Sequence, residues 1–473
     1  MLRVLYVDNG ICLSGGLNWD LPESLQNHAD LEVDVVVPRV AGINEGEGRL
    51  AERLVEISAR VAGVDHKVSV LEGRRNGHVR TFYMDNEVLR DGLNLKDDRG
   101  ITASAVFSHA VCQWLAKSPV AYDIVHCVGL ETALVPTLMR RVYNNDSRVS
   151  AARCVALVAG IEDKGTIDMC WLDRLGLPGD LGSSEGMEFY GRLSILNGVY
   201  LYADTIAFPN DGIRRRIEKN RGKDIGMEGV LFGRLDAIQT IGLGISKKKS
   251  GPENDKTIAA AFGAADMSGK NRCKAAFVKK YHLGKDRPLV AFIGSLDAES
   301  GIDLVNDILD DLMDREVNLV IAGAGNDAYQ SAVSGWCGEF KGSVAWIDHR
   351  PACQEVREIL SAADSLLMPS KHECLCRLHL TAMQYGCVVV ARNAGAVAQD
   401  IHRVRNLEKI SDEDNGFTFL KYDSDDFYDT VMDALDVYAS PSWNDIRAHA
   451  MAGCTCICKT ADDCVKIYNN LKG

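Results

Sequence analysis

Short apolar runs alternate with helix-like stretches along nearly the whole chain. Runs of this length, rich in Val, Ile and Leu, are typical of strands that are buried on both faces, and their alternation with helices is typical of a covered parallel sheet. The predicted strands are residues 3–7, 31–38, 122–128 and 153–160 in the first half, and 288–294, 317–325, 343–348, 364–369 and 387–392 in the second. The pattern predicts an α/β protein with two doubly wound, Rossmann-like domains.

One polar, proline-containing stretch, residues 244–256, interrupts this alternation. Such a stretch between patterned segments is typical of a domain boundary. We therefore expect an N-terminal domain at residues 1–246 and a C-terminal domain at 247–437, followed by a helical segment at 438–473.

Several loops that follow predicted strands are rich in glycine or in charged residues. They are the turn with Gly15 and Gly16, the segment 294–301, the turn with Gly323 and Gly325, and the segment 369–378. In open α/β sheets, ligands bind beyond the carboxyl ends of the strands, and two such sheets facing a cleft suit a nucleotide-linked substrate. These loops are the candidate site.

The net charge of -13 narrows the choice of ligand. Nonspecific binding to nucleic acid or to an anionic membrane depends on clustered Lys and Arg, so we expect neither partner. No stretch approaches the roughly 18 apolar residues of a membrane helix, and the N-terminus enters a strand without a signal core. We expect a cytoplasmic protein.

Fifteen cysteines are scattered without paired sets at zinc spacing, which indicates reduced thiols. The tightest group is Cys454, Cys456 and Cys458, followed by Cys464. It is compatible with a soft-metal site or with alternating small residues in a terminal segment. The run 372–376 (HECLC) lacks the second His of HExxH, so we do not predict a metalloprotease.

A set of collinear segments indicates more specifically which protein family the chain resembles. They are LSGGL (13–17), VDVVVPRV (33–40), YDIVHC (122–127), TALVP (132–136), LGLP (175–178), LNGVYLYADTIAFPN (196–210), DMSGKNRCKAAFVKKYHL (266–283), LVIAGAGN (319–326), AADSLLMPSKHE (362–373), TAMQYGCVVVAR (381–392) and NGFTF (415–419). In this order they resemble bacterial glycogen synthases and plant starch synthases. Those enzymes are retaining glycosyltransferases that move glucose from ADP-glucose onto an α-1,4-glucan.

The resemblance implies the B-type glycosyltransferase fold, with two Rossmann-like domains facing a cleft and the last helix crossing back to the first domain. It implies a nucleotide sugar and an α-glucan as partners, and no metal or other cofactor. The family stabilises its departing diphosphate with cationic side chains, the kind of preorganised charge that lowers a transition-state barrier.

The chain departs from the family at these cations. Leu13 stands where the family has the lysine of Lys-x-Gly-Gly. Ser295 and Ser300 stand where the family has an arginine and a lysine that are expected to hold the phosphates. Three positive charges are therefore replaced by neutral side chains.

The acceptor-side motifs are altered as well. The family reads His-Cys-His-Asp-Trp-His-Thr where this chain has Val128, Gly129, Leu130 and Glu131 after its His-Cys. Ala159 and Gly160 replace the family's His-Asn motif, and the interdomain loop has changed at residues 243–246.

A few family positions remain. Glu373 stands where the family has the Glu of its Glu-x-x-Gly motif, with Cys376 in place of the glycine, and is the candidate catalytic carboxylate. The alternative is that Glu373 caps the following helix. The candidate nucleotide-sugar-binding residues are Gly15, Gly16, Gly323, Gly325 and Arg377. Arg377, with Lys371, His372 and Arg392, either supplies replacement cations or lies in a solvated loop.

The sequence thus predicts a glycogen or starch synthase-like glycosyltransferase whose standard activity is weakened or lost. Two alternatives stay open: a non-catalytic glucan-binding or regulatory scaffold, and a transferase of changed donor specificity.

Overall fold

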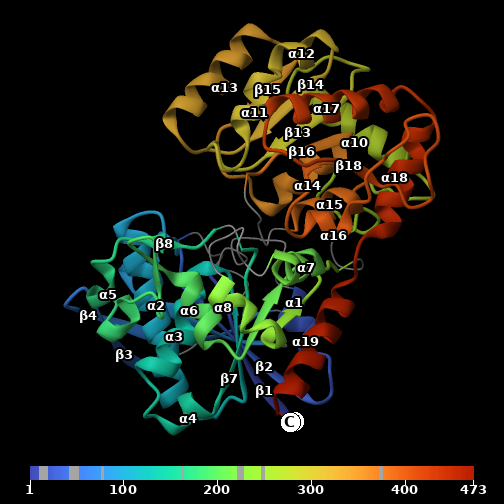
Figure 1. Ribbon diagram of the computed structural model, residues 1–473. Helices are drawn as coiled ribbons and strands as arrows, with labels where there is room; N and C mark the ends of the chain where they lie inside the picture. The colour runs from blue at the N-terminus through green and yellow to red at the C-terminus, as the bar shows by residue number, and fades with distance from the viewer. Residues whose placement is uncertain are drawn as a thin grey trace. The chain divides into compact units, whose positions relative to one another are not determined.

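The computed structural model describes residues 1–9, 20–41, 53–75, 79–161, 163–220, 228–246, 251–371 and 377–472 (Figure 1). The chain forms two compact units: unit 1 is Met1–Gly242 with Cys458–Gly473, and unit 2 is Leu243–Ile457. In Figure 1, unit 1 runs from blue to green and ends in the red helix α19 (Ile457–Lys472).

Unit 1 is built on a sheet that has nine strands within the described residues. In spatial order they are β12 (Ile238–Thr240), β11 (Thr205–Phe208), β7 (Arg153–Leu157), β6 (Ile124–Val128), β1 (Leu2–Val7), β2 (Leu31–Pro38), β5 (Val79–Asp85), β4 (Val64–Arg75) and β3 (Arg53–Val61). The strands from β12 to β5 are parallel. Of these, β1, β2, β6 and β7 coincide with the predicted apolar runs, whereas β5, β11 and β12 were not predicted.

The pattern did not predict the antiparallel hairpin of β3 and β4 at one end of this sheet. Its two turn residues, Ala62 and Gly63, have φ angles of 50° and 78°. A two-residue turn with positive φ at both positions is the preferred hairpin connection, but an alanine at the first position is a weak signal for it in a sequence.

The helices of unit 1 are α1 (Asp20–Gln26), α2 (Asp98–Lys117), α3 (Leu134–Arg141), α4 (Ser147–Ala151), α5 (Trp171–Arg174), α6 (Ile195–Tyr202), α7 (Asp211–Asn220), α8 (Glu228–Phe232) and the returning α19. Buried apolar side chains of α2 to α8 join one core with the sheet. A small sheet of β8 (Thr166–Ile167), β10 (Arg192–Ser194) and β9 (Glu188–Phe189) accompanies them. None of the helices in the described part of the chain is both long and apolar enough to cross a membrane.

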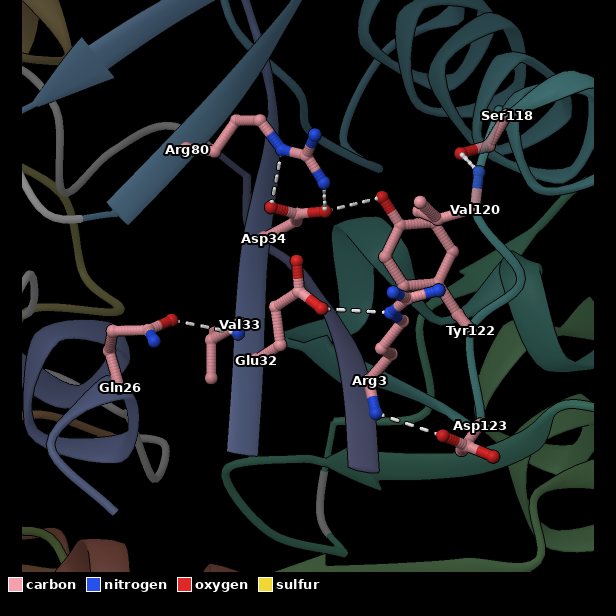
Figure 2. A network of polar contacts seen from close by, with 10 residues as sticks. All are labelled: Arg3, Gln26, Glu32, Val33, Asp34, Arg80, Ser118, Val120, Tyr122 and Asp123. Atoms are coloured by element: carbon pink, nitrogen blue, oxygen red, sulfur yellow. Dashed lines mark hydrogen bonds and ion pairs between the residues drawn. The ribbon is translucent and has the colours of Figure 1, made fainter. Parts of the chain in front are cut away.

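A polar network fixes the amino edge of this sheet (Figure 2). Arg80 donates from Nε and Nη2 to the two carboxylate oxygens of Asp34, at 2.8 and 2.5 Å, and the Tyr122 hydroxyl donates to the same carboxylate at 2.7 Å. Asp34 is buried, so each of these donors offsets part of the cost of removing its charge from water. The network ties the segment before β6 to strands β2 and β5.

Unit 2 contains a parallel sheet, six-stranded within the described residues. In spatial order its strands are β15 (Val344–Ile347), β14 (Asn318–Ala322), β13 (Leu289–Ile293), β16 (Ser365–Met368), β17 (Val388–Arg392) and β18 (Gly416–Phe419). Its helices are α10 (Ser268–Lys280), α11 (Ile302–Asp307), α12 (Leu309–Asp314), α13 (Asp327–Glu339), α14 (Cys353–Ala362), α15 (Leu378–Gln384), α16 (Val397–Asp400), α17 (Ser424–Tyr438) and α18 (Ser442–Gly453).

A buried lysine joins two helix ends in unit 2. The ammonium of Lys270 donates to the carbonyls of Leu360, Ser361 and Tyr385, at 3.0, 3.3 and 2.8 Å. Burial lowers the pKa of Lys270 to about 8. These carbonyls lie at the ends of α14 and α15, where helices leave acceptors without intrahelical partners, so Lys270 acts as a shared cap.

The boundary expected at residue 246 lies close to the observed one at Gly242, but the return to unit 1 begins at Cys458 rather than at residue 438. Helix α18 lies between these positions, and its Trp443 and Ile446 belong to the core of unit 2. The prediction for 438–457 was therefore wrong, because an amphipathic pattern does not say which core the apolar face joins.

Candidate functional site

In unit 1, three neighbouring parallel strands end at the same edge and place acidic residues there. Asp8 and Asn9 follow β1, Glu131 follows β6, and Asp163 lies in the segment after β7. The Asn9 amide donates to the Glu131 carboxylate at 3.3 Å. The resemblance implies histidine side chains in the loop after β6, whereas this chain has Gly129, Leu130 and Glu131 there.

The environment of Glu131 favours its neutral form. Burial is the largest cause that raises the pKa of Glu131, and the negative charges of Asp8 and Asp163 raise it further. Gly129 makes this arrangement possible: its φ is 84°, and a Cβ there would lie 2.7 Å from the Glu131 carboxylate. The replaced motif is thus a packed local structure and not a loose loop.

In unit 2, the loop after β13 contains the two serines that replace phosphate-binding cations. The Ser300 amide donates to the Asp297 carboxylate at 2.9 Å, and the loop ends at Gly301, whose φ is 83°. A Cβ at Gly301 would lie 2.4 Å from the Pro369 carbonyl, so the loop packs closely against the end of β16. The position expected to hold a diphosphate contains hydroxyls and a carboxylate.

Gly323 and Gly325 have a clear structural role. The loops after β13 and β14 pair through Leu296, whose amide donates to Ala324 at 3.2 Å and whose carbonyl accepts from Asn326 at 2.9 Å. A Cβ at Gly323 would lie 1.8 Å from the Gly294 carbonyl, and one at Gly325 would lie 2.6 Å from the Leu296 carbonyl. The close approach of two loops therefore accounts for both glycines without a ligand.

Further carboxylates surround the same edge. The Tyr422 hydroxyl lies 2.7 Å from both the Ala298 carbonyl and the Asp303 carboxylate. Burial raises the pKa of Tyr422 well above its usual range, and the hydrogen bond to Asp303 adds to this. The pKa of Tyr329 is raised by burial first and then by the negative charges of Asp303 and Asp297. The electrostatic environment of this edge is acidic.

Two predicted replacement cations lie at this edge, but both contact the protein. The Arg392 guanidinium donates to the carbonyl of Ser370, at 2.9 Å, and to that of Lys371. The Lys371 ammonium lies 5.8 Å from the centre of the Tyr422 ring. Sequence reasoning did not identify Tyr422 or the main-chain contacts of Arg392, since no sequence motif records which partners these side chains have in the fold.

Arg377 immediately precedes α15, and only 3% of it is exposed. Its carbonyl accepts from the Thr381 amide at 3.0 Å. Its Nε and Nη1 atoms are buried without a hydrogen-bond partner among the described residues. Arg377 is thus not a solvated loop residue, and its role toward a nucleotide sugar stays a prediction.

A buried His-Asp pair follows Arg377 and was not predicted. His379 Nε2 lies 2.9 Å from the Asp400 carboxylate, to which the Thr455 hydroxyl also donates at 3.2 Å. Both residues of the pair are buried. The pair ties α15 to α16 next to the loop of the candidate site.

Gly15, Gly16, Leu13, His372 and Glu373 lie outside the described residues, so their predicted roles stay predictions.

Within the described residues, no group of three or more His, Cys, Asp or Glu side chains is arranged to hold a metal ion. This includes the cysteine group. Cys454 donates to the carbonyls of Leu380 and Ala450, at 3.4 and 3.5 Å. The choice between a soft-metal site and a structural role for Cys454, Cys456, Cys458 and Cys464 stays a prediction.

The chain matches two protein families in sequence. Residues 15–232 match the family described as starch synthase catalytic domain, and residues 287–437 match glycosyl transferases group 1.

Similar proteins span nearly the same length. The chain is 29% identical over 374 residues to the glycogen synthase of Koribacter versatilis, covering 78% of this chain and 75% of that protein. It is 25% identical over 456 residues to the glycogen synthase of Thermosipho melanesiensis, covering 95% and 93%. The similarity is therefore not confined to one unit.

A solved structure agrees with the fold. The catalytic domain of starch synthase IV from Arabidopsis thaliana, bound to ADP and acarbose, superimposes with a TM-score of 0.87 at 20% sequence identity. The match covers 100% of this chain and 99% of that one.

Proposed function

Because the chain belongs to the glycogen and starch synthase family, we propose that it is a glycogen synthase-like protein in which glucose transfer from ADP-glucose to an α-1,4-glucan is strongly weakened. The observation that carries this proposal is the loop after β13, where Ser295, Ser300 and Asp297 occupy the region in which the family is expected to hold phosphates.

The size of the expected loss in transfer rate follows from electrostatics. A hydrogen bond to a charged group contributes roughly 1.5–3 kcal/mol, and losing one preorganised contact to a developing charge lowers a rate by about 10²–10³. Three lost cations and a lost histidine therefore remove several orders of magnitude, even when such losses are not additive. The nearby carboxylates of Asp303 and Asp297 oppose an incoming diphosphate further.

A nucleotide sugar and an α-glucan remain the proposed ligands. The starch synthase IV structure contains ADP and acarbose, and a related structure from Anabaena contains UDP and glucose. In this chain, Glu373 is the proposed carboxylate beside the sugar, and Arg377 is the proposed cation on the nucleotide side. We propose no metal or other cofactor and a cytoplasmic location.

A second candidate is a scaffold that binds glucan without turnover. Its support is the packing of two altered loops: Gly129 accommodates Glu131, and Gly301 permits a close approach to the Pro369 carbonyl. A site that had merely decayed would not need these contacts, and a fold can persist for binding alone.

Two measurements on the purified chain test both candidates. The first is incorporation of glucose from ADP-glucose into glycogen, beside an authentic glycogen synthase at equal concentration. We expect a rate at least about 10³-fold lower, from the loss per contact given above. An equal rate would refute the proposal.

The second measurement is calorimetric titration with ADP, UDP, GDP and maltoheptaose. Binding of maltoheptaose without any nucleotide selects the scaffold. Tight binding of UDP or GDP together with turnover of the matching glucose donor selects changed donor specificity.

A further inference from the structure

Unit 1 has a polar cavity at the amino edge of its sheet, the opposite edge from the candidate site. Its volume is about 640 Å³, within the range of small-molecule sites. Asp204 and Thr205 line it at the start of β11, Gln239 lines it from β12, and Ile467 and Asn470 line it from α19. Every lining residue belongs to unit 1.

Two arginines that line this cavity are held in fixed orientations. Arg234 donates from Nη1 to the carbonyls of Tyr200 and Leu201, at 2.8 and 2.9 Å, and from Nη2 to that of Ala203 at 2.6 Å. Arg140 donates to the carbonyls of Ser150 and Ala152 at 3.0 and 2.9 Å. Neither guanidinium needs to lose much side-chain freedom when a ligand binds, which is a favourable condition for affinity.

Arg234 keeps donors for a ligand. A guanidinium has five N–H groups, and within the described residues three of those of Arg234 donate to carbonyls. The Nε–H and the second Nη2–H remain, and these two form one side of the planar fork. That side matches two oxygens of a phosphate or carboxylate in a bidentate arrangement.

The charge around the cavity favours an anion, although the whole chain carries a net charge of -13. The Asp204 carboxylate accepts from Arg140 at 2.7 Å, from Arg153 at 3.0 Å and from the Cys154 amide at 2.8 Å, so its negative charge is already balanced. The lining holds Arg140 and Arg234 against Asp204 and Asp236. Arg153 does not line the cavity, but its contact with Asp204 adds a third positive charge beside it.

The remaining lining favours a ligand that also carries hydroxyl groups. The side chains of Gln239, Asn470 and Thr205 can donate and accept hydrogen bonds, while Ile467 and Leu471 add an apolar wall. The volume exceeds what an inorganic ion alone requires.

We infer that this cavity binds a small hydroxylated phosphomonoester, such as a sugar phosphate, at a site separate from the transfer reaction. The ligand's phosphate contacts Arg234, and its hydroxyls contact Gln239 and Asn470. Because Ile467, Asn470 and Leu471 come from α19, the bound ligand also stabilises the packing of this helix on unit 1. The inference does not depend on the proposed function.

Calorimetric titration of the full chain with glucose 6-phosphate tests this inference, with inorganic phosphate, glucuronate and maltotriose as further probes. We expect glucose 6-phosphate to bind more tightly than inorganic phosphate, and maltotriose not to bind this cavity. Hydrogen exchange should show protection of residues 467–471 when glucose 6-phosphate is bound. If glucuronate binds more tightly than glucose 6-phosphate, the cavity prefers a carboxylate to a phosphate, and the inference is overturned.

Two variants locate the binding. Arg234→Gln should abolish the binding of glucose 6-phosphate. Because this change also removes a cap from the end of α6, Gln239→Glu serves as the second variant. It adds one negative charge to the lining and should weaken glucose 6-phosphate binding about tenfold or more. Asn444→Asp adds the same charge at an exposed position of α18 in unit 2 and should have no effect.

The inference fails if glucose 6-phosphate does not bind the unaltered chain, or if Gln239→Glu and Asn444→Asp bind it equally well. Protection confined to unit 2, or maltotriose competing for the same residues, would also overturn it.

Discussion

The amino and carboxyl edges of the two parallel sheets differ in how their charges are compensated. At the amino edges, buried carboxylates have cationic partners: Asp34 with Arg80 in unit 1, and Asp364 with Lys274 at 2.6 Å and Arg447 at 3.3 Å in unit 2. At the carboxyl edges, Glu131 in unit 1 and Asp303 in unit 2 lie near further carboxylates.

This difference distinguishes the charges that stabilise the fold from the charges that would bind a diphosphate. The charges that hold the elements together are paired. The positive charges that a diphosphate needs are absent from the positions where the family has them, although the chain has arginines elsewhere. The proposed function requires that the fold persists without the family's standard chemistry, and the following predictions test this.

Restoring two cations at the carboxyl edge of unit 2 should have the largest effect. Ser295→Arg combined with Ser300→Lys should tighten ADP binding about 10²-fold or more, because each of the two new charged hydrogen bonds contributes roughly 1.5–3 kcal/mol. Calorimetric titration with ADP measures this.

The control for this pair is Ser334→Arg with Ser331→Lys on α13, which adds the same charge at exposed positions. If the control tightens ADP binding equally, net charge and not the loop after β13 is responsible.

Gly323→Ala should destabilise unit 2 by about 3 kcal/mol or more, because the new methyl group would overlap the Gly294 carbonyl at a φ of 154°. The shift of the urea unfolding midpoint of unit 2 measures this. Gly338→Ala in α13 has no atom within 4 Å of its Cβ and should instead stabilise by about 0.5–1 kcal/mol. A tolerated Gly323→Ala would contradict the close approach of the two loops.

Lowering the pH should destabilise unit 1 through His126. This residue is fully buried on β6, with Nδ1 2.6 Å from the Tyr468 hydroxyl of α19, and burial lowers its pKa to about 3. Below the ordinary value of 6.5 the unfolded chain binds a proton that the folded chain does not, so the stability present above pH 6.5 is lost between about 6.5 and 3.

The expected slope from His126 is about 1.4 kcal/mol per pH unit below 6.5. Urea unfolding of unit 1 at pH 7, 6 and 5 measures it. His126→Gln should reduce the slope, whereas exposed His402→Gln should leave it unchanged. Equal slopes in all three proteins would show that His126 is not the responsible group.

Tyr122→Phe should have the smallest effect, about 1.5 kcal/mol in the free energy of unfolding of unit 1. The change removes one hydrogen bond to buried Asp34 but leaves both contacts from Arg80. Tyr190→Phe removes a hydroxyl from a residue that is 81% exposed, and its urea midpoint should match that of the unaltered chain. A loss in Tyr122→Phe no larger than in this control would show that Arg80 alone compensates Asp34.

The sequence by itself determined the fold class and the family. Valine-rich apolar runs have one stable environment, the inside of a covered parallel sheet, and collinear motifs such as residues 196–210 and 381–392 record that arrangement directly. It also showed which cations are missing, because Leu13, Ser295 and Ser300 can be read without coordinates.

Only the tertiary structure decided what the remaining side chains contact. It assigned Gly323 and Gly325 to loop packing, directed Arg392 to main-chain carbonyls and placed α18 in unit 2. It also brought Arg140, Arg234 and Asn470 around one cavity. The physical reason is that a periodic pattern describes one element and its neighbours in sequence, whereas close approach, burial and shared charge arise between residues that are distant in the chain.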